Sequence, residues 1–115
     1  MLERREHSRL QAPVLVEFVD PYSAKPERSF THDISTSGMR FPTAVKFQVG
    51  QEVPFALDLP SERPPFHATG QVVWVREVAR LDATQYDVGV RFRWVEDPDL
   101  QRLSSFLVAC LSSEV

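Results

Sequence analysis

The chain has 115 residues, the usual length of one domain, with 43% hydrophobic residues, 25% charged residues and a formal net charge of −3. This composition excludes a disordered chain, and the acidic balance disfavours binding to bulk nucleic acid. No stretch approaches the roughly 18 to 20 apolar residues of a membrane helix. One cysteine, Cys110, and three widely spaced histidines provide neither a disulfide framework nor a recognisable metal motif, so we expect no metal and no cofactor.

The N-terminal residues are charged rather than apolar. Met1 to Glu6 have no hydrophobic segment behind their charges, so no secretory signal is predicted and a cytoplasmic location is expected. Residues 1–10 carry too many charges to pack as core, and we expect them to form a flexible arm. The remaining residues, 11–115, are predicted to form one domain.

Alternation of apolar and polar residues predicts a series of short strands. They span residues 14–19, 28–34, 39–41, 52–59, 66–78 and 86–95, and turns rich in Pro, Gly, Ser and Asp separate them. In the strand over residues 66–78, alternation sets Val73 and Val75 on one face and Val72 and Trp74 on the other.

In the last strand the same alternation places Val88, Val90, Phe92 and Trp94 on one face. We therefore assign Phe92 and Trp94, together with Phe106, to the core or to contact with the C-terminal helix. A glycine inside this strand, Gly89, indicates a bulge or a close backbone approach.

After residue 95 the hydrophobic period changes to three and four. Apolar residues at positions 100, 103, 106, 107, 110 and 111 predict an amphipathic helix over about residues 97–112. Asp97 is the expected N-cap, and Pro98 suits the first helical position. Six or seven antiparallel strands followed by one helix predict an all-β fold, a small closed or nearly closed β-barrel whose opening or edge the helix covers.

Arginine dominates the basic residues, because only Lys25 and Lys46 of the 13 are lysines. Arg4, Arg5 and Arg9 fall within the first nine residues. The guanidinium fork suits phosphate oxygens and the guanine edge, so an arginine cluster in an acidic chain indicates one compact anionic ligand. Taken alone, the cluster is also typical of an ordinary solvated terminus.

A second motif follows the strand predicted over residues 28–34. It consists of Asp33, Ser35 and Gly38 at fixed offsets. Taken alone, these residues are equally typical of an Asx-turn with Gly38 at positive φ. The two motifs precede and follow an antiparallel hairpin, so they are expected at the same end of the sheet, and their joint occurrence favours a ligand site.

Together the two motifs resemble the PilZ domain family, whose pattern is RxxxR followed by [D/N]xSxxG. Residues 70–75 (GQVVWV) and 88–92 (VGVRF) are similar to the later barrel strands of that family. The resemblance extends from about Arg4 to Leu111. It implies a bacterial, stand-alone receptor for cyclic di-GMP, and we expect no enzymatic activity.

The resemblance implies a ligand-binding set of Arg4, Arg5, Arg9, Asp33, Ser35, Gly38 and Trp74. The carboxylate of Asp33 can accept protons from guanine N1 and N2, a pattern that adenine does not supply. Ser35 can donate to a phosphate or shape the turn, and Gly38 permits positive φ or a close backbone approach. Trp74 suits either the core or a stacking surface for guanine.

The basic residue Arg4 bears on how many ligands bind. In proteins resembling this one, a basic residue at that place accompanies two intercalated cyclic di-GMP molecules rather than one. Two such molecules bring four phosphate charges together, and an added cation offsets their repulsion.

The expected mechanism is a ligand-driven change in which the arm folds over the nucleotide and presents a new surface. The resemblance implies a downstream protein partner in motility, adhesion or exopolysaccharide machinery. Two other functions stay open. One is a ligand-independent protein–protein adaptor of the same family, and the other is a small barrel that binds single-stranded nucleic acid, which the net charge disfavours.

Overall fold

The computed structural model describes residues 10–11, 13–59 and 65–112. Within these ranges the chain forms seven strands and one helix. They are β1 (Leu15–Val19), β2 (Pro26–Phe30), β3 (Asp33–Ile34), β4 (Gly38–Thr43), β5 (Glu52–Asp58), β6 (Phe66–Ala79), β7 (Thr84–Val95) and α1 (Asp97–Ser112). The mainly β fold with a C-terminal helix is confirmed. The predicted arm lies outside the described residues except for Leu10. Leu10 is buried in the core and pairs with Ile34, so its assignment to a flexible arm was wrong.

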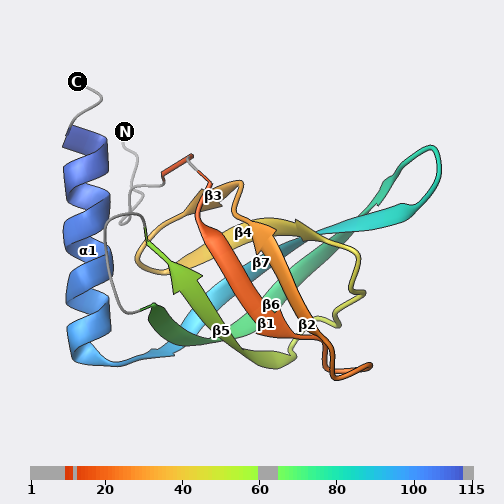
Figure 1. Ribbon diagram of the computed structural model, residues 1–115, viewed down its shortest axis with the longest axis horizontal. Helices are drawn as coiled ribbons and strands as arrows, with labels where there is room; N and C mark the ends of the chain where they lie inside the picture. The colour runs from red at the N-terminus through yellow and green to blue at the C-terminus, as the bar shows by residue number, and fades with distance from the viewer. Residues whose placement is uncertain (1–9, 12, 60–64, 113–115) are drawn as a thin grey trace.

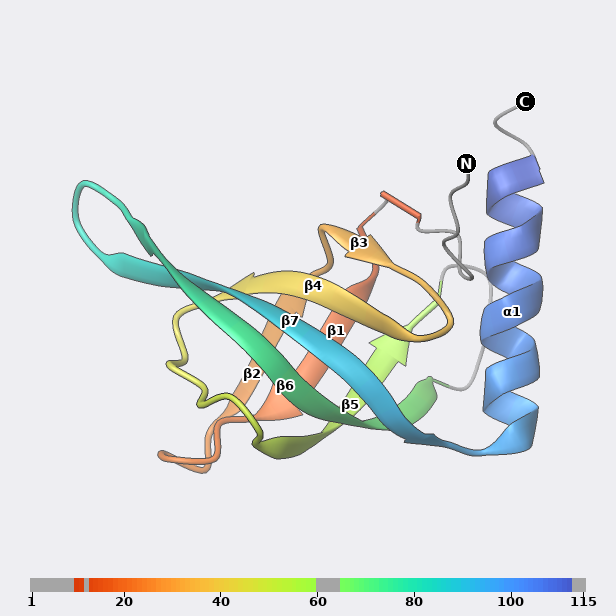
Figure 2. The same cartoon turned by 180° about the vertical axis from the view of Figure 1, so that it is seen from behind.

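All strand pairs are antiparallel, in the order β2-β1-β5-β6-β7-β4-β3. The sheet curls until β2 approaches β4, where the hydroxyl of Ser29 donates to the backbone carbonyl of Pro42. The result is a half-barrel that is nearly closed. Figures 1 and 2 show α1 at one end of it and the β6–β7 hairpin projecting from the other.

Aromatic side chains fill the centre of the half-barrel. The ring of Phe18 lies 5.8 Å from Phe41, 5.4 Å from Phe47 and 5.7 Å from Phe55, measured between centroids. All four rings are buried. Burying one such side chain stabilises the fold by roughly 1.5 to 3 kcal/mol. Alternate residues of β1 and β5 point into this core, so the residues between them lie on the outer face.

Helix α1 covers one end of the half-barrel. Leu103 and Leu107 are buried against it, as the three-and-four spacing predicts. The N–H of Leu100 donates to the carbonyl of Glu96 at 2.9 Å, so Glu96 rather than Asp97 occupies the cap position. The predicted cap was therefore wrong by one residue.

The strand predicted over residues 28–34 is divided into β2 and β3. Thr31 is held by Val14, whose N–H donates to Thr31 Oγ1 at 3.0 Å. The next residue, His32, donates its N–H to the carbonyl of Arg40 at 2.7 Å. The chain thus changes partners between Thr31 and His32, which brings Asp33 beside β4 at the edge of the sheet.

Two β-bulges reverse the predicted alternation. In β7, Gly70 pairs with Phe92 and Thr69 with Trp94, so Arg93 is the extra residue. One extra residue turns the next side chain to the other face. Trp94 is consequently 66% exposed, and the assignment of Trp94 to the core was wrong.

The second bulge lies in β6, where Val72 pairs with Val90 and Trp74 with Gly89, so Val73 is the extra residue. Val72 is buried, whereas Trp74 is 39% exposed. The prediction that Val72 and Trp74 share a face was therefore wrong, and the bulge directs the indole outward.

Candidate ligand-binding site

A row of four residues crosses the outer face of β3, β4, β7 and β6. The antiparallel register sets Asp33 opposite Arg40, Arg40 opposite Gly89, and Gly89 opposite Trp74. The row lies in a hollow of about 520 Å³. The hollow is lined by Asp33, Ser37, Gly38, Met39, Arg40, Val73, Trp74, Gly89, Val90 and Arg91.

Asp33 and Arg40 form a cross-strand ion pair at one end of this row. Arg40 Nε donates to Asp33 Oδ2 at 3.2 Å. Asp33 is buried, and the arginine side chain is about one-third exposed. The carboxylate is thus held in one orientation at the wall of the hollow. Arg40 was not among the predicted site residues, although its place two residues after Gly38 on a predicted strand was a usable signal.

Ser35 shapes the turn between β3 and β4. Its side chain is fully buried. Its Oγ accepts the N–H of Ser37 at 3.2 Å and lies 3.0 Å from Ser37 Oγ. Of the two roles weighed for Ser35, these bonds support turn formation. Ser37, and not Ser35, is among the residues that line the hollow.

Gly38 is required by a close backbone approach. A Cβ at this position would lie 2.2 Å from the carbonyl oxygen of Val90. Among the described glycines, the one with positive φ is Gly50, at 95°. Of the two reasons weighed for Gly38, close approach is confirmed and positive φ is wrong.

Gly89 allows the indole of Trp74 to lie on the strand beside it. A Cβ at position 89 would be 2.2 Å from Trp74 Nε1. The prediction for Gly89 was a bulge in its own strand or a close backbone approach. The structure shows instead a close approach by the Trp74 side chain, and the bulge lies opposite, in β6. The structure therefore places Trp74 on the outer face beside the hollow, not in the core.

A charged cluster lies next to the row, toward the β6–β7 hairpin. Asp87 on β7 binds Arg76 Nη2 through Oδ2 at 2.7 Å and His32 Nε2 through Oδ1 at 3.2 Å. Burial raises the pKa of Asp87, but the hydrogen bond from Arg76 and the attraction of His32 outweigh it. The pKa lies below its ordinary value of 3.8. This cluster ties the start of β3 to β7.

The arginine motif itself lies outside the described residues, since Arg4, Arg5 and Arg9 are all within residues 1–9. The chain directly after it is described. Leu10 is buried and pairs with Ile34, with N–H to carbonyl distances of 2.8 and 3.0 Å in the two directions. Leu10, which directly follows Arg9, therefore lies beside Ile34, which directly follows Asp33.

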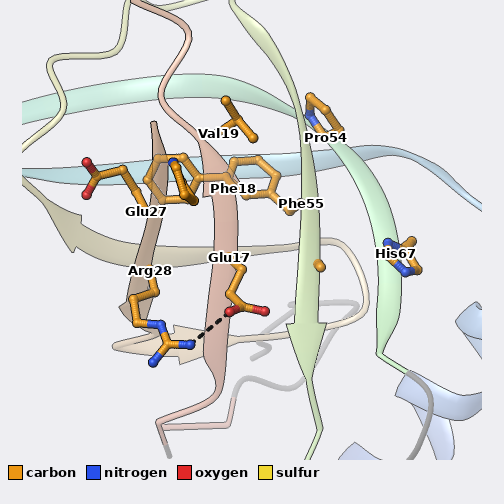
Figure 3. A pocket seen from close by; sticks show the side chains of 10 residues that line it. Glu17, Phe18, Val19, Glu27, Arg28, Pro54, Phe55 and His67 are labelled. Atoms are coloured by element: carbon orange, nitrogen blue, oxygen red, sulfur yellow. Dashed lines mark hydrogen bonds and ion pairs between the residues drawn. The ribbon is translucent and has the colours of Figure 1, made fainter. Parts of the chain in front are cut away.

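A second hollow, of about 700 Å³, lies on the opposite outer face, over β1, β2, β5 and the start of β6. Figure 3 shows Val19 and Pro54 there, with Arg28 bonded to Glu17 at 3.0 Å. Its lining is mainly apolar and includes two glutamates, Glu17 and Glu27. This chemistry does not suit a phosphate, and the hollow contains none of the motif residues.

Two further features concern the described residues alone. In residues 10–11, 13–59 and 65–112, no three His, Cys, Asp or Glu side chains are grouped as a metal site would require. Helix α1, the helix in this part of the chain, is not long and apolar enough to cross a membrane.

The family model of the PilZ domain matches residues 3–109. The chain belongs to the PilZ domain family. No curated protein sequence matches it significantly.

Solved structures share the PilZ fold of this chain. The PilZ domain of YcgR from Escherichia coli, solved with c-di-GMP, has a TM-score of 0.72 and 21% identity over 97% of this chain and 94% of that one. Bacillus subtilis MotI/DgrA, an inhibitor of motility, has a TM-score of 0.79 and 17% identity over 97% of this chain and 53% of that one. The K. pneumoniae MrkH–c-di-GMP complex has a TM-score of 0.78 and 16% identity over 98% of this chain and 55% of that one. The chain thus spans about half the length of MotI and MrkH.

Proposed function

We propose that this PilZ domain is a receptor for cyclic di-GMP. The observation that carries the proposal is the row of Asp33, Arg40, Gly89 and Trp74 on the outer face. Neighbouring strands are about 4.8 Å apart, so the row spans roughly 14 Å, the scale of a ligand with two bases. A carboxylate at one end accepts from guanine N1 and N2, and an indole at the other end offers a stacking surface.

The charges of the ligand are neutralised in this proposal by arginines. The arm up to Arg9 folds over the nucleotide, with Arg5 and Arg9 donating to phosphate oxygens or to guanine O6 and N7. The pairing of Leu10 with Ile34 supports this arrangement, because it fixes the chain directly after Arg9 next to Asp33. Ordering the arm costs conformational entropy, which the charge-assisted bonds must exceed.

Arg4 extends the same cation cluster. We infer that it permits two intercalated ligands to bind, since four phosphate charges in one site need additional positive charge. The planar guanidinium can also continue the guanine stack.

The ordered arm and the covered turn would then present a new surface to a downstream protein of the motility, adhesion or exopolysaccharide machinery. YcgR and MrkH, which share the fold, were solved with c-di-GMP, and MotI/DgrA is an inhibitor of motility. We propose that this chain acts in the cytoplasm by binding and shape change rather than by catalysis.

Calorimetry with cyclic di-GMP tests the proposal, with cyclic di-AMP as the matched ligand that lacks the guanine edge. Saturable binding of cyclic di-GMP and much weaker binding of cyclic di-AMP support the receptor. If cyclic di-GMP produces neither heat nor any chemical-shift change, the receptor proposal is wrong. The ligand-independent adaptor would then be the favoured function.

A further inference from the structure

Two arginines converge on one neutral side chain at the rim of the hollow. Gln71 Oε1 on β6 accepts from Arg91 Nη2 at 3.3 Å and from Arg93 Nη1 at 3.1 Å. Arg91 also lines the hollow that contains Asp33 and Trp74. Both arginines are exposed, so most of their N–H donors face solvent.

The strand register explains the convergence. Gln71 lies opposite Arg91, and Arg93 follows two residues later in β7, within reach of the same glutamine. Arg93 is also the extra residue of the β7 bulge. β-Bulges often occur beside functional sites, where they redirect a side chain. The bulge that redirects Trp74 borders the same hollow.

The two guanidinium groups lack an acidic counterpart in the part of the chain that the structure describes. Every ion pair of the described residues involves other arginines or His32. Glu52 on β5 pairs with Gln71 on β6, which places a carboxylate next to the glutamine that both arginines contact. No ion pair joins Glu52 to either arginine. Like charges repel unless an anion lies between them, so this arrangement suits an anion better than an empty surface.

We propose that Arg91 and Arg93, held together by Gln71, form a phosphate-binding subsite at the rim of the hollow. The subsite rests on the proposed function and deepens it, because the group it binds is a phosphodiester of the nucleotide whose base stacks on Trp74. Two forks of donors on one phosphate give charge-assisted, bidentate contacts. The arginine motif of the arm is therefore not the sole source of positive charge for the ligand.

The test compares Arg91→Gln and Arg93→Gln, singly and combined, with Arg80→Gln. The control is matched, because Arg80 Nε also donates to a glutamine, Gln85 Oε1, at 3.1 Å. It carries the same charge change as each single variant, and Arg80 lies directly after the end of β6. Affinity for cyclic di-GMP is measured by calorimetry at low and at moderate salt.

The combined variant should bind cyclic di-GMP at least about tenfold more weakly, as expected for loss of charge-assisted hydrogen bonds. Its affinity should also depend less on salt, because two cations are gone. Arg80→Gln should bind within about twofold of the wild type, as for a distant surface charge. If the combined variant matches Arg80→Gln in affinity and in salt dependence, the subsite is wrong while the receptor function stands. That outcome includes the case in which these arginines serve an acidic protein segment instead.

A second measurement keeps the subsite testable if a variant fails to fold or if the wild type binds no cyclic di-GMP. Inorganic pyrophosphate is titrated into the wild-type protein while the arginine Nε–Hε NMR signals are followed. Saturable shifts at Arg91 and Arg93, with Arg80 unchanged, support the subsite on their own. Equal, unsaturable shifts at all three overturn it.

Discussion

In the proposed receptor, Asp33 serves both the fold and the ligand. Its carboxylate is buried at the edge of the sheet and is bonded to Arg40 at 3.2 Å. Arg40 compensates the charge of this buried carboxylate, and its hydrogen bond fixes the direction in which the carboxylate points, which the proposed guanine-selective acceptor requires.

Replacing Asp33 by Ala is therefore expected to weaken binding of cyclic di-GMP and to reduce the preference for cyclic di-GMP over cyclic di-AMP. Calorimetry with both ligands measures the ratio of their affinities. Arg40→Gln should lower the same ratio less, because the carboxylate remains but loses its orienting partner. Equal loss of affinity for both ligands in Asp33→Ala would indicate that the residue only forms the turn.

The two glycines of the site are expected to respond differently to a methyl group. In Gly38→Ala the new Cβ meets a backbone carbonyl, that of Val90 at 2.2 Å, which cannot move aside. We expect the free energy of unfolding to fall by about 2 to 3 kcal/mol. In Gly89→Ala the Cβ meets the indole of Trp74, which can rotate away. That variant should lose only about 1 kcal/mol of stability but bind cyclic di-GMP more weakly.

Urea unfolding and calorimetry on the two glycine variants separate these effects. The explanation for Gly89 fails if Gly89→Ala binds the ligand as tightly as the wild type, because the position of the indole would then be irrelevant to binding.

Among the elements, β6 and β7 were predicted well in extent but not in the direction of their side chains. Strand 66–78 and strand 86–95 correspond to Phe66–Ala79 and Thr84–Val95. A bulge adds one residue without any change in hydrophobicity, so the alternation of Val72 and Trp74, or of Phe92 and Trp94, gave no sign of it. The bulges lie beside the hollow, where local rules of strand pairing are commonly broken for function.

The cluster on Asp87 connects β3 to the β6–β7 hairpin, and its contribution to stability should depend on pH. The pKa of Asp87 is lower in the folded protein than its ordinary value of 3.8. A lowered pKa means that folding favours the carboxylate, so the cluster stabilises the fold above about pH 4 and loses this effect as the pH falls further.

Asp87→Asn is accordingly expected to lower the free energy of unfolding by roughly 1 to 2 kcal/mol at neutral pH, since it weakens the charge-assisted hydrogen bond from Arg76 and the hydrogen bond with His32. The difference from the wild type should be full at pH 5 and should shrink below about pH 4. Urea unfolding across this range measures it. A difference that grows with acidification would contradict the assignment of Asp87 as the group responsible.

The arm is the element on which the proposed relay depends. We expect Arg9→Ala to weaken binding of cyclic di-GMP by roughly 2 kcal/mol or more, the effect of losing a charge-assisted bidentate contact. The melting temperature without ligand should stay within a few degrees of the wild type, because a charged arm adds little to the core. Unchanged affinity in the folded variant would remove the arm from the binding mechanism.

For the molecule as a whole, the fold class followed from sequence because alternation, turn residues and the final change of period all agreed. The site followed only in part. Asp33 and Gly38 belong to one short sequence motif. Arg40, Arg91 and Arg93 lie near it only because the strands that carry them pair side by side. Register across a curled sheet is not visible in a single sequence, so Arg91 and Arg93 could be placed only once the strand order was known.

The central claim is that this PilZ domain binds cyclic di-GMP on the outer face of β3, β4, β6 and β7. Isothermal calorimetry of the wild type with cyclic di-GMP tests it most directly, because one experiment gives both affinity and stoichiometry. We predict saturable binding of two ligands per chain, reduced toward one in Arg4→Leu and weakened in Asp33→Ala. One ligand per chain would remove the role of Arg4 alone. A folded wild-type protein that takes up no cyclic di-GMP would contradict the receptor function itself.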